Sequence, residues 1–323
     1  MREVMFVQAL GEAMAEEMER DPRVILMGED VQLGAFGQTR GLVERFGPGR
    51  VRNTPLAEVG FTGAGIGAAA SGLRPVVNIM MANFLYVTMD QIVNQLAKLR
   101  YMSGGQVDFP IVIWATTGAG GSAAAQHSDN PAAMFVNVPG LKIVKPGNPY
   151  DVKGLMKSSI RSNSPIIFFE ETTLGMMKQP IPDEEYTVPI GKGEVKREGT
   201  DITVVAIGCM VSQALSAAEK LEKEGISVEV VDPRTLVPLD KDIILNSVAK
   251  TGKVVVCDDA PPLCSVASEI SATINEEGFD FLKAPVARVT REHVPVPFSP
   301  PMEKFVLPNE EKIINKVKEV AKR

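Results

Sequence analysis

Short runs of β-branched and apolar residues alternate with helix-like segments along this chain, and that alternation limits the possible folds more than any other feature. Val24–Met27, Pro110–Thr116 and Pro165–Phe169 are typical of buried strands. Phe6–Met18 has apolar residues at helical spacing, and Asp151–Arg161 indicates a second helix. We also expect a strand over Leu73–Met80 that Pro75 breaks early, and a longer helix over Tyr86–Met102. Strands and helices in this order predict an α/β fold with a mostly parallel sheet between helices.

A stretch rich in proline, glycine and charge interrupts the alternation between Met176 and Thr200. The pattern then resumes with shorter elements. We expect strands at Ile202–Ile207 and Val254–Cys257, helices at Val211–Glu224 and Ser265–Glu277, and a terminal helix after Asn309. A chain of 323 residues is long enough for two domains of ordinary size. We therefore expect a first domain over 1–185, a linker over 186–200 and a second domain over 201–323.

The composition excludes several classes of protein. The apolar fraction of 45% is a globular value, and the net charge of −6 gives no electrostatic reason to bind nucleic acid. No apolar run approaches the ~18 residues of a membrane span, and the acidic N-terminal segment does not fit a signal peptide. Cys209, Cys257 and Cys264 form no CxxC pair, so we expect buried or partly buried free thiols. These features predict a soluble, cytoplasmic protein with no membrane or nucleic-acid partner.

The chain has only two histidines, so imidazole chemistry has few candidates. His127 follows a glycine-rich loop at Gly118–Ser122, and His293 lies near the proline-rich VPVPFSPP segment. With three scattered cysteines they form no zinc motif, and we expect no metal ligand in this chain. Ser128 and Asp129 cannot form a catalytic triad with His127, because sequence neighbours do not converge in that way. His127 is either an ordinary loop residue or an acid–base group at the edge of the sheet.

The GAGIG segment at Gly63–Gly67 permits two interpretations. It lacks the full GxGxxG pattern and the acid about 20 residues later that a dinucleotide loop needs, so tight helix packing explains it better. A non-catalytic nucleotide- or flavin-binding module is the alternative that this segment supports. Glu58 stands just before it. The Glu58 carboxylate either complements a helix N-terminus or is a buried acid that exchanges a proton with a bound heterocycle.

Several motifs along the chain resemble those of a known protein family. In the first domain the resemblance is carried by GED (28–30), TPLAEVGFTGAGIGAA (54–69), DQIVNQLAK (90–98), RYMSGG (100–105) and AAAQHS (123–128). In the second it is carried by GISVEVVDPRTLVPLD (225–240) and APVARVT (284–290). In this order these motifs resemble the β subunit of the thiamine-diphosphate-dependent first component of 2-oxoacid dehydrogenase complexes. AAAQHS and PPLCSVASEIS (261–271) are most similar to acetoin dehydrogenase β subunits.

The resemblance implies a transketolase-like α/β fold of two parallel-sheet domains, a pyrimidine-binding domain and a transketolase C-terminal domain. It implies an enzyme that cleaves a carbon–carbon bond next to a carbonyl of a 2-oxoacid or acetoin and passes the acyl group to a lipoyl carrier. In this family an α subunit holds the diphosphate and Mg²⁺ of thiamine diphosphate through a GDG motif, which this sequence lacks. The implied unit is a heterotetramer of two α and two β chains that serves a lipoyl acyltransferase core.

The resemblance also assigns roles to individual residues. Glu58 matches the glutamate that hydrogen-bonds the aminopyrimidine ring and activates the cofactor by proton exchange. Phe84 matches the aromatic ring that packs on the pyrimidine, and Glu29 matches an acid near that ring. His127 matches an active-site histidine that orders its loop, handles protons or assists acyl transfer to lipoyl. His293 lies outside these motifs, and we interpret it as structural.

Some positions depart from the family pattern. Ser162 stands where an aspartate is common in the potassium-site segment, so a potassium ion would rely on backbone carbonyl oxygens. Asp129 replaces the usual glutamine two residues after His127, and Leu174-Gly175 replaces the usual Leu-Tyr. These changes leave the substrate open. They permit an alternative function, a thiamine-dependent ketone- or diketone-cleaving lyase or transferase that serves no lipoyl complex.

Overall fold

The computed structural model describes residues 1–323, which divide into two compact units. The first unit comprises Met1–Thr117, Met134–Val144 and Asn148–Ile190, and the second comprises Gly118–Ala133, Lys145–Gly147 and Gly191–Arg323. A boundary at 186–200 leaves out two short segments, 118–133 and 145–147, that belong to the second unit although they precede that boundary. The longer of these segments carries His127.

A parallel sheet forms the centre of the first unit, as predicted. Its strands lie in the order β6-β7-β5-β4-β2-β3, and each neighbouring pair is parallel. Every residue of β2 is buried, so this strand is a continuous apolar run without alternation. The strands of the sheet are β2 (Val24–Gly28), β3 (Val51–Asn53), β4 (Arg74–Met81), β5 (Val112–Thr117), β6 (Lys142–Val144) and β7 (Ile166–Glu171).

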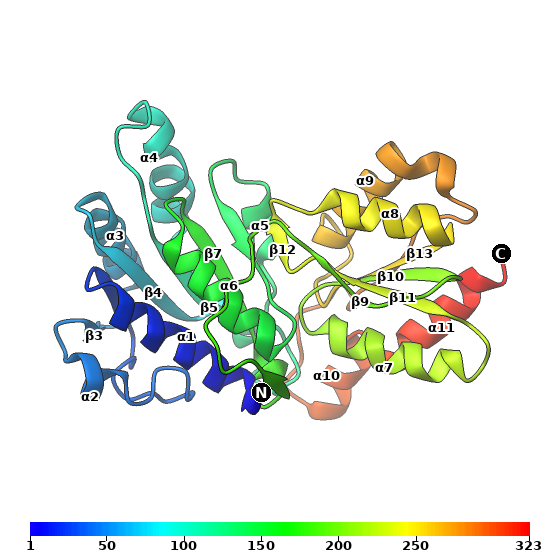
Figure 1. Cartoon of the computed structure of the whole chain (residues 1–323), viewed down its shortest axis with the longest axis horizontal. Coiled ribbons are helices and arrows are strands. Elements are labelled where there is room, and N and C mark those ends of the chain that lie inside the picture. The colour runs from blue at the N-terminus through cyan, green and yellow to red at the C-terminus, as the bar shows by residue number, and fades with distance from the viewer. The chain divides into compact units, whose positions relative to one another are not determined.

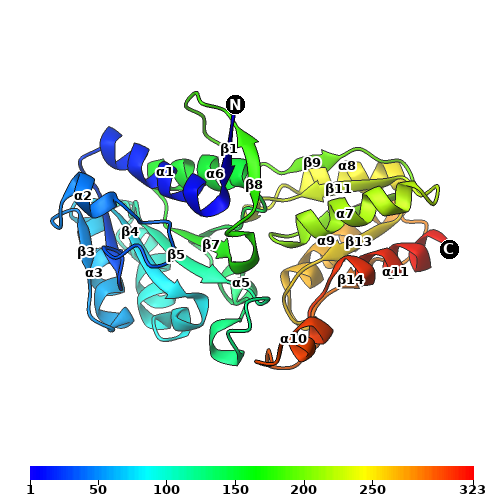
Figure 2. The same ribbon diagram turned by 90° about the horizontal axis from the view of Figure 1, so that it is seen from below.

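Helices cover both faces of this sheet (Figure 1 and Figure 2). On one face α1 (Phe6–Arg20) packs along α6 (Pro149–Arg161). On the other face lie α3 (Glu58–Ala70), the π-helical η2 (Asp90–Leu96) and α4 (Ala97–Met102). The smaller elements are α2 (Leu42–Phe46), η1 (Ala82–Tyr86), η4 (Thr172–Leu174) and an antiparallel pair of β1 (Arg2–Met5) with β8 (Lys178–Ile181).

One local expectation for the first unit is wrong and another is confirmed in part. Pro75 does not break its strand, because β4 runs past it with Pro75 opposite Ile25 of β2. The expected helix over Tyr86–Met102 is helical from Asp90 to Met102, with the π-helical η2 followed directly by α4. Pairing within the sheet thus overrides the local break signal of Pro75.

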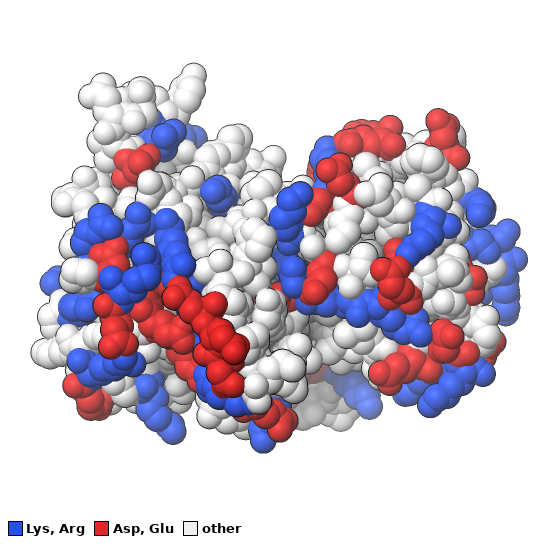
Figure 3. Space-filling view, viewed as in Figure 1, with Lys and Arg blue, Asp and Glu red and all other residues white.

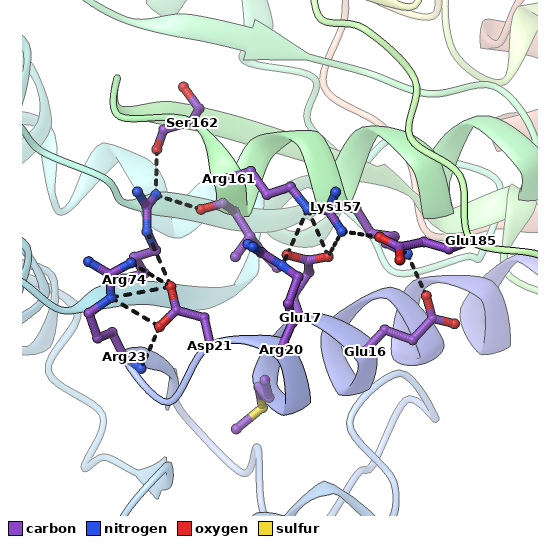
Figure 4. Close-up of polar contacts among 12 residues, drawn as sticks. Glu16, Glu17, Arg20, Asp21, Arg23, Arg74, Lys157, Arg161, Ser162 and Glu185 are labelled. Atoms are coloured by element: carbon purple, nitrogen blue, oxygen red, sulfur yellow. Dashed lines mark hydrogen bonds and ion pairs between the residues drawn. The ribbon is translucent and has the colours of Figure 1, made fainter.

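Acidic residues of α1 pair with basic residues of α6 (Figure 4). Glu17 is fully buried and accepts a hydrogen bond from Arg161 Nη2 at 2.6 Å, and Glu16 accepts one from Lys157 Nζ at 2.6 Å. Glu12 and Glu16 keep part of their carboxylates at the surface, where acidic side chains gather along α1 in Figure 3. Buried charges are tolerated only when they are paired, so these contacts fix how α1 lies on α6.

The second unit has a smaller sheet in the order β14-β13-β10-β11-β9. All its neighbours are parallel except the edge strand β9, which is antiparallel to β11 and lies in the expected linker. The helices α7 and α11 cover one face and α8 and α9 the other (Figure 1). The strands are β9 (Glu194–Arg197), β10 (Ile202–Ala206), β11 (Val228–Asp232), β13 (Val254–Cys257) and β14 (Ala287–Val289). The helices are α7 (Met210–Glu222), α8 (Lys241–Thr251), α9 (Val266–Gly278) and α11 (Glu310–Ala321).

The remaining elements are short. They are η3 (Ala125–His127), α5 (Ala132–Val136), β12 (Thr235–Val237), η5 (Phe279–Phe281) and α10 (Pro300–Val306). None of the three cysteines forms a disulfide, but Cys264 is exposed, which corrects the expectation of buried or partly buried thiols. No helix combines the length and the apolar character that crossing a membrane requires.

Candidate active site

Glu58 is the first residue of α3, and the small residues that follow let this helix lie close to the sheet. The cap residue Ala57 offers no side-chain hydrogen bond, so the Glu58 carboxylate is the acidic group of the first turn, where the helix dipole favours an anion. On the inward face a Cβ added at Gly65 would lie 2.6 Å from Val77 Cγ2. Tight packing within the chain therefore explains Gly65, whereas a Cβ at Gly63 would make only an ordinary contact and one at Gly67 would meet nothing within 4 Å.

Glu29 lies close enough to Glu58 for the Glu58 charge to raise the pKa of Glu29. It follows Gly28, which ends β2 with a φ of +156° and whose added Cβ would lie 2.5 Å from the Asn78 carbonyl oxygen. Glu29 is buried, and its Oε1 has no hydrogen-bond partner. Burial raises the pKa of Glu29, and the charges of Glu58 and then Asp30 raise it further. The structure therefore brings together two of the residues that the sequence selected.

A small pocket opens at the carboxyl ends of β2, β4 and β5. This is the edge at which parallel α/β sheets place their ligands. Its lining includes Glu29, Gln38, Asn78, Met80, Trp114 and Thr116. Its lining mixes carboxyl, amide and hydroxyl groups with apolar side chains, so it offers hydrogen-bonding groups to a small polar ligand.

A buried carboxylate that the sequence analysis missed supports this pocket. Glu170, near the end of β7, accepts hydrogen bonds from Gln38 Nε2 at 2.6 Å and from Trp114 Nε1 at 2.9 Å. Burial raises the pKa of Glu170 to about 7, although these donors favour its ionised form. Its only local signal is a glutamate at the end of the apolar run IIFFEE.

Phe84 and His127 lie on short elements that follow strands of the first sheet. Phe84 is a partly buried residue of η1, directly after β4. His127 is an exposed residue of η3, on the segment that belongs to the second unit. Glu29, Glu58 and Phe84 are therefore in the first unit and His127 in the second. His293 is exposed in the loop after β14.

The carbonyl oxygens of the potassium-site segment already have a cationic partner. Arg74 Nη1 donates to the carbonyl oxygens of Ile160 and Ser162 at 2.9 and 3.0 Å (Figure 4). Arg74 Nη2 also donates to Asn163 Oδ1 at 2.6 Å. A guanidinium thus covers the end of α6, where unpaired carbonyls carry partial negative charge.

Comparison with known proteins gives the family. The model of the transketolase pyrimidine binding domain matches residues 2–177, and that of the transketolase C-terminal domain matches residues 191–313. The β subunit of acetoin:2,6-dichlorophenolindophenol oxidoreductase from Bacillus subtilis (strain 168) is 45% identical, over 97% of this chain and 96% of the relative. The 2-oxoisovalerate dehydrogenase β subunit of the same strain is 45% identical over 98% of both chains. The pyruvate dehydrogenase E1 component β subunit of Rickettsia bellii (strain RML369-C) is 45% identical over 97% of both.

Solved structures support the fold. A split-gene transketolase that forms an inactive tetramer of beta chains matches with a TM-score of 0.84 at 22% identity, over 99% of both chains. A transketolase from Pichia stipitis matches with a TM-score of 0.72 at 18% identity, over 99% of this chain and 46% of that chain. The three curated relatives have different substrates in their names but equal identity, so identity does not choose among those substrates. The chain belongs to the thiamine-dependent, transketolase-like family of β subunits that includes those of the acetoin, branched-chain 2-oxoacid and pyruvate dehydrogenases.

Proposed function

We propose that this chain is the β subunit of a thiamine-diphosphate-dependent dehydrogenase that cleaves a carbon–carbon bond next to a carbonyl of a 2-oxoacid or acetoin. The acyl group passes to a lipoyl carrier, and the chain is active only with an α subunit. One observation carries the proposal: Glu58 lies at the first turn of α3 beside buried Glu29, in a chain 45% identical to curated β subunits.

The first unit fits the pyrimidine half of thiamine diphosphate. An aminopyrimidine has a ring nitrogen that can accept a proton, and Glu58 presents a carboxyl group at a helix N-terminus. When bound, the cofactor supplies a carbon nucleophile for a carbonyl substrate. In our proposal Glu58 holds or moves the proton at the ring nitrogen, Glu29 supplies a second carboxyl group nearby, and Phe84 excludes water from one face of the ring.

The diphosphate half has no matching residues here, because the sequence contains no GDG motif. We assign the diphosphate and its Mg²⁺ to the α subunit, in a heterotetramer of two α and two β chains. The outward face of α3 supports such a partner, since Gly60, Gly63, Ala64 and Gly67 are exposed along it. A Cβ at Gly67 would meet nothing within 4 Å, so packing within this chain does not require glycine there. A closely approaching helix of a partner would require it.

A potassium ion has no part in our proposal. Arg74 already donates to the carbonyl oxygens of Ile160 and Ser162, on which a cation at this segment would depend. A guanidinium supplies the same positive charge in a fixed, planar geometry. We infer that Arg74 takes the place of a monovalent cation in this chain.

His127 is the residue that we propose for acyl transfer. Its imidazole is exposed on η3, so a carrier outside the chain can approach it. A neutral imidazole accepts a proton and an imidazolium donates one, which suits transfer to the disulfide of an oxidised lipoyl group. One sulfur then takes the acyl group as a thioester, the S–S bond breaks, and the other sulfur takes up a proton to become a thiol. We propose a lipoyl acyltransferase core as the partner that brings this group.

A second candidate is a thiamine-dependent ketone- or diketone-cleaving lyase or transferase without a lipoyl partner. The observation that favours it is the ion pair between Asp129 and Arg291, 3.0 Å long, two residues from His127. It places charged groups where the family has an uncharged glutamine. Comparing the products formed with a lipoyl domain as acceptor and without it separates the two candidates.

The split cofactor site gives the direct test. This chain, a candidate α subunit that contains a GDG motif and their mixture would each be titrated calorimetrically with thiamine diphosphate in the presence of Mg²⁺. We expect tight binding by the mixture alone. Tight binding by this chain on its own would overturn the assignment of the diphosphate to a partner.

A further inference from the structure

The loop that carries His127 is closed at its base and belongs to the second unit. Gly118 N donates to the carbonyl oxygen of Asp129 at 3.1 Å, so residues 118–129 form one loop. His127 lies near the end of this loop, with its backbone N donating to the Ala124 carbonyl oxygen at 3.2 Å. The position of the imidazole therefore depends on what holds the loop.

Glu303 of α10 holds the first part of the loop. This side chain is 4% exposed, and its Oε1 accepts a hydrogen bond from Gly120 N at 2.8 Å. Its Oε2 accepts from Ser122 N at 3.0 Å and from Ser122 Oγ at 3.3 Å. Ser122 has a φ of +52°, a left-handed conformation that is unfavourable for a residue with a side chain. The charge-assisted bonds to one carboxylate offset that cost and fix the turn before His127.

Arg291 holds the residues directly after His127. It follows β14 and is 4% exposed, and its backbone N donates to the Ala260 carbonyl oxygen at 3.2 Å. Arg291 Nη1 donates to the Ser128 carbonyl oxygen at 3.1 Å, and Nη2 donates to Asp129 Oδ1 at 3.0 Å. One rigid guanidinium therefore fixes two consecutive residues, which a lysine with a single nitrogen cannot do in the same geometry.

Asn130, which follows Asp129, also contacts buried charged residues of the second unit. Asn130 Nδ2 donates to Asp258 Oδ1 at 3.3 Å and to Asp259, and Lys145 Nζ pairs with Asp259 at 3.1 Å. Burying charged groups costs free energy that an apolar contact would avoid. Because several buried charged groups contact this one loop, we infer that the loop occupies one defined position.

We propose that Arg291 and Glu303 are positioning residues for His127, which hold its imidazole where acyl transfer or proton transfer takes place. Arg291 acts from the residue after His127 and Glu303 from the turn before it. The pairing of Asp129 with Arg291 also accounts for the aspartate at this position of the chain. This inference rests on the role given to His127 in the proposed function, so its test separates the two.

The first experiment needs no activity. The full chain has only two histidines, so a nuclear magnetic resonance spectrum with ring-¹⁵N histidine contains two imidazoles, and His127→Asn identifies the signals of His127. In Glu303→Gln and Arg291→Lys we expect these signals to shift or broaden. Asp129→Asn breaks the ion pair between Asp129 and Arg291 from its partly exposed side. This variant still tests the proposal if the variants of buried Arg291 or Glu303 do not fold.

Matched controls lie on the same two elements. Arg288 of β14 bonds the Pro262 carbonyl oxygen instead of the loop, and Lys304 of α10 is exposed beside Glu303. Arg288→Met and Lys304→Met should leave the His127 signals where they are. Unchanged His127 signals in folded Arg291→Lys, Asp129→Asn and Glu303→Gln chains would overturn the proposal.

The second experiment uses the enzyme reconstituted with its α subunit, with an oxidised lipoyl domain as acyl acceptor and acetoin, pyruvate or 2-oxoisovalerate as substrate, and it follows acylation of the lipoyl domain by mass spectrometry. We expect Arg291→Lys to lower kcat about tenfold with little change in KM, and to lower it less than about twofold in a His127→Asn background. If Arg291→Lys lowered kcat equally in the wild-type and His127→Asn chains, the proposal that Arg291 acts by positioning His127 would be overturned. A kcat unchanged by His127→Asn would overturn the role of His127 itself, while the spectra still decide whether the anchors fix it.

Discussion

Glu58, at the start of α3, raises the pKa of Glu29, which directly follows β2. Burial is the largest cause of this shift and the charge of Glu58 the next. Glu29 is 6% exposed and has an oxygen without a partner, whereas Glu58 is partly buried in the first turn of α3. Two carboxyl groups in such different surroundings are suited to different roles in one proton exchange.

Glu58→Gln should remove activity without disturbing assembly. Glutamine keeps the shape and hydrogen-bonding length of the side chain, but it cannot exchange a proton at pH 7. With the α subunit present, we expect turnover to fall by at least about 100-fold, the range that a positioned acid–base group contributes. Turnover is measured with 2,6-dichlorophenolindophenol, and the mass of the complex by light scattering after size-exclusion chromatography.

Glu44→Gln is the matched control for this variant. Glu44 also lies in the first turn of a helix, α2, but it is exposed. We expect this control to keep full turnover and normal assembly. Retained turnover in Glu58→Gln would refute the proton-exchange role, and a loss of assembly would show that the residue supports structure instead.

Glu170 should make the stability of the chain depend on pH. Its pKa is raised from 4.5 to about 7 in the folded state, so folding favours the protonated form. The stabilising contribution is fully present below the unfolded pKa and is lost as the pH rises through about 7. The shift corresponds to about 3 kcal/mol between pH ~4 and pH ~8. Urea unfolding across this pH range measures it.

Glu170→Gln should flatten this pH dependence, because an amide does not titrate. We also expect lower stability at acidic pH, since one amide cannot accept from both Gln38 and Trp114 with the same geometry as a carboxyl group. Glu219→Gln on the exposed surface of α7 is the control and should leave the wild-type slope. An equally steep slope in Glu170→Gln would assign the pH dependence to other groups.

Much of the fold follows from periodicity, since β-branched runs and helical spacing are local signals. α8 was missed although both its ends are marked: Asp240 accepts a hydrogen bond from Ile243 N, and Gly252 ends the helix with a φ of +74°. Pro75 gave the opposite error, because a local break signal had no effect inside a paired strand. Local rules thus identified most elements and misjudged those whose neighbours decide the outcome.

The candidate site likewise contains residues that the sequence predicted and residues that only the structure reveals. Glu29, Glu58, Phe84 and His127 stand in recognisable motifs, so the sequence alone selected them. Glu170 stands in none, and its partners Gln38 and Trp114 are 132 and 56 positions away. Arg291 bonds Asp129 across 162 positions. Such pairs are created by the fold, and a single sequence carries no signal that joins them.

Arg74 should make the chain indifferent to potassium. Its Nη1 donates to the carbonyl oxygens of Ile160 and Ser162, so these oxygens do not need a cation. We expect equal melting temperatures in KCl and NaCl at the same ionic strength. Arg74→Met should lower the free energy of unfolding by about 1–3 kcal/mol, because two partly buried carbonyl oxygens lose their donor, and Arg52→Met at the surface should lower it little. A wild-type chain that is stabilised by potassium but not by sodium would contradict this prediction.

Two glycines of α3 should respond in opposite ways to alanine. At Gly65 the new Cβ would lie 2.6 Å from Val77 Cγ2 in the buried core, so we expect a loss of about 1 kcal/mol or more from overpacking. At Gly67 a Cβ meets nothing within 4 Å, so we expect a gain of about 1 kcal/mol from helix propensity. Chemical unfolding of the isolated chain measures both. Equal effects at the two positions would contradict the packing seen on the inward face.

A larger residue at Gly67 tests whether the outward face of α3 binds the α subunit. Gly67→Leu should leave the isolated chain as stable as Gly67→Ala, because this face has open space and leucine is a good helix former. A partner helix that packs closely against the small residues would be pushed away by the leucine side chain, so we expect the Kd for the α subunit to rise at least about tenfold. Glu219→Leu, on an exposed face of α7, introduces the same side chain elsewhere and should leave the Kd unchanged. Since Glu58 begins this same helix, a weakened Kd would also place the partner beside the candidate proton-exchange site. An unchanged Kd in Gly67→Leu would move the α subunit to another face of the chain.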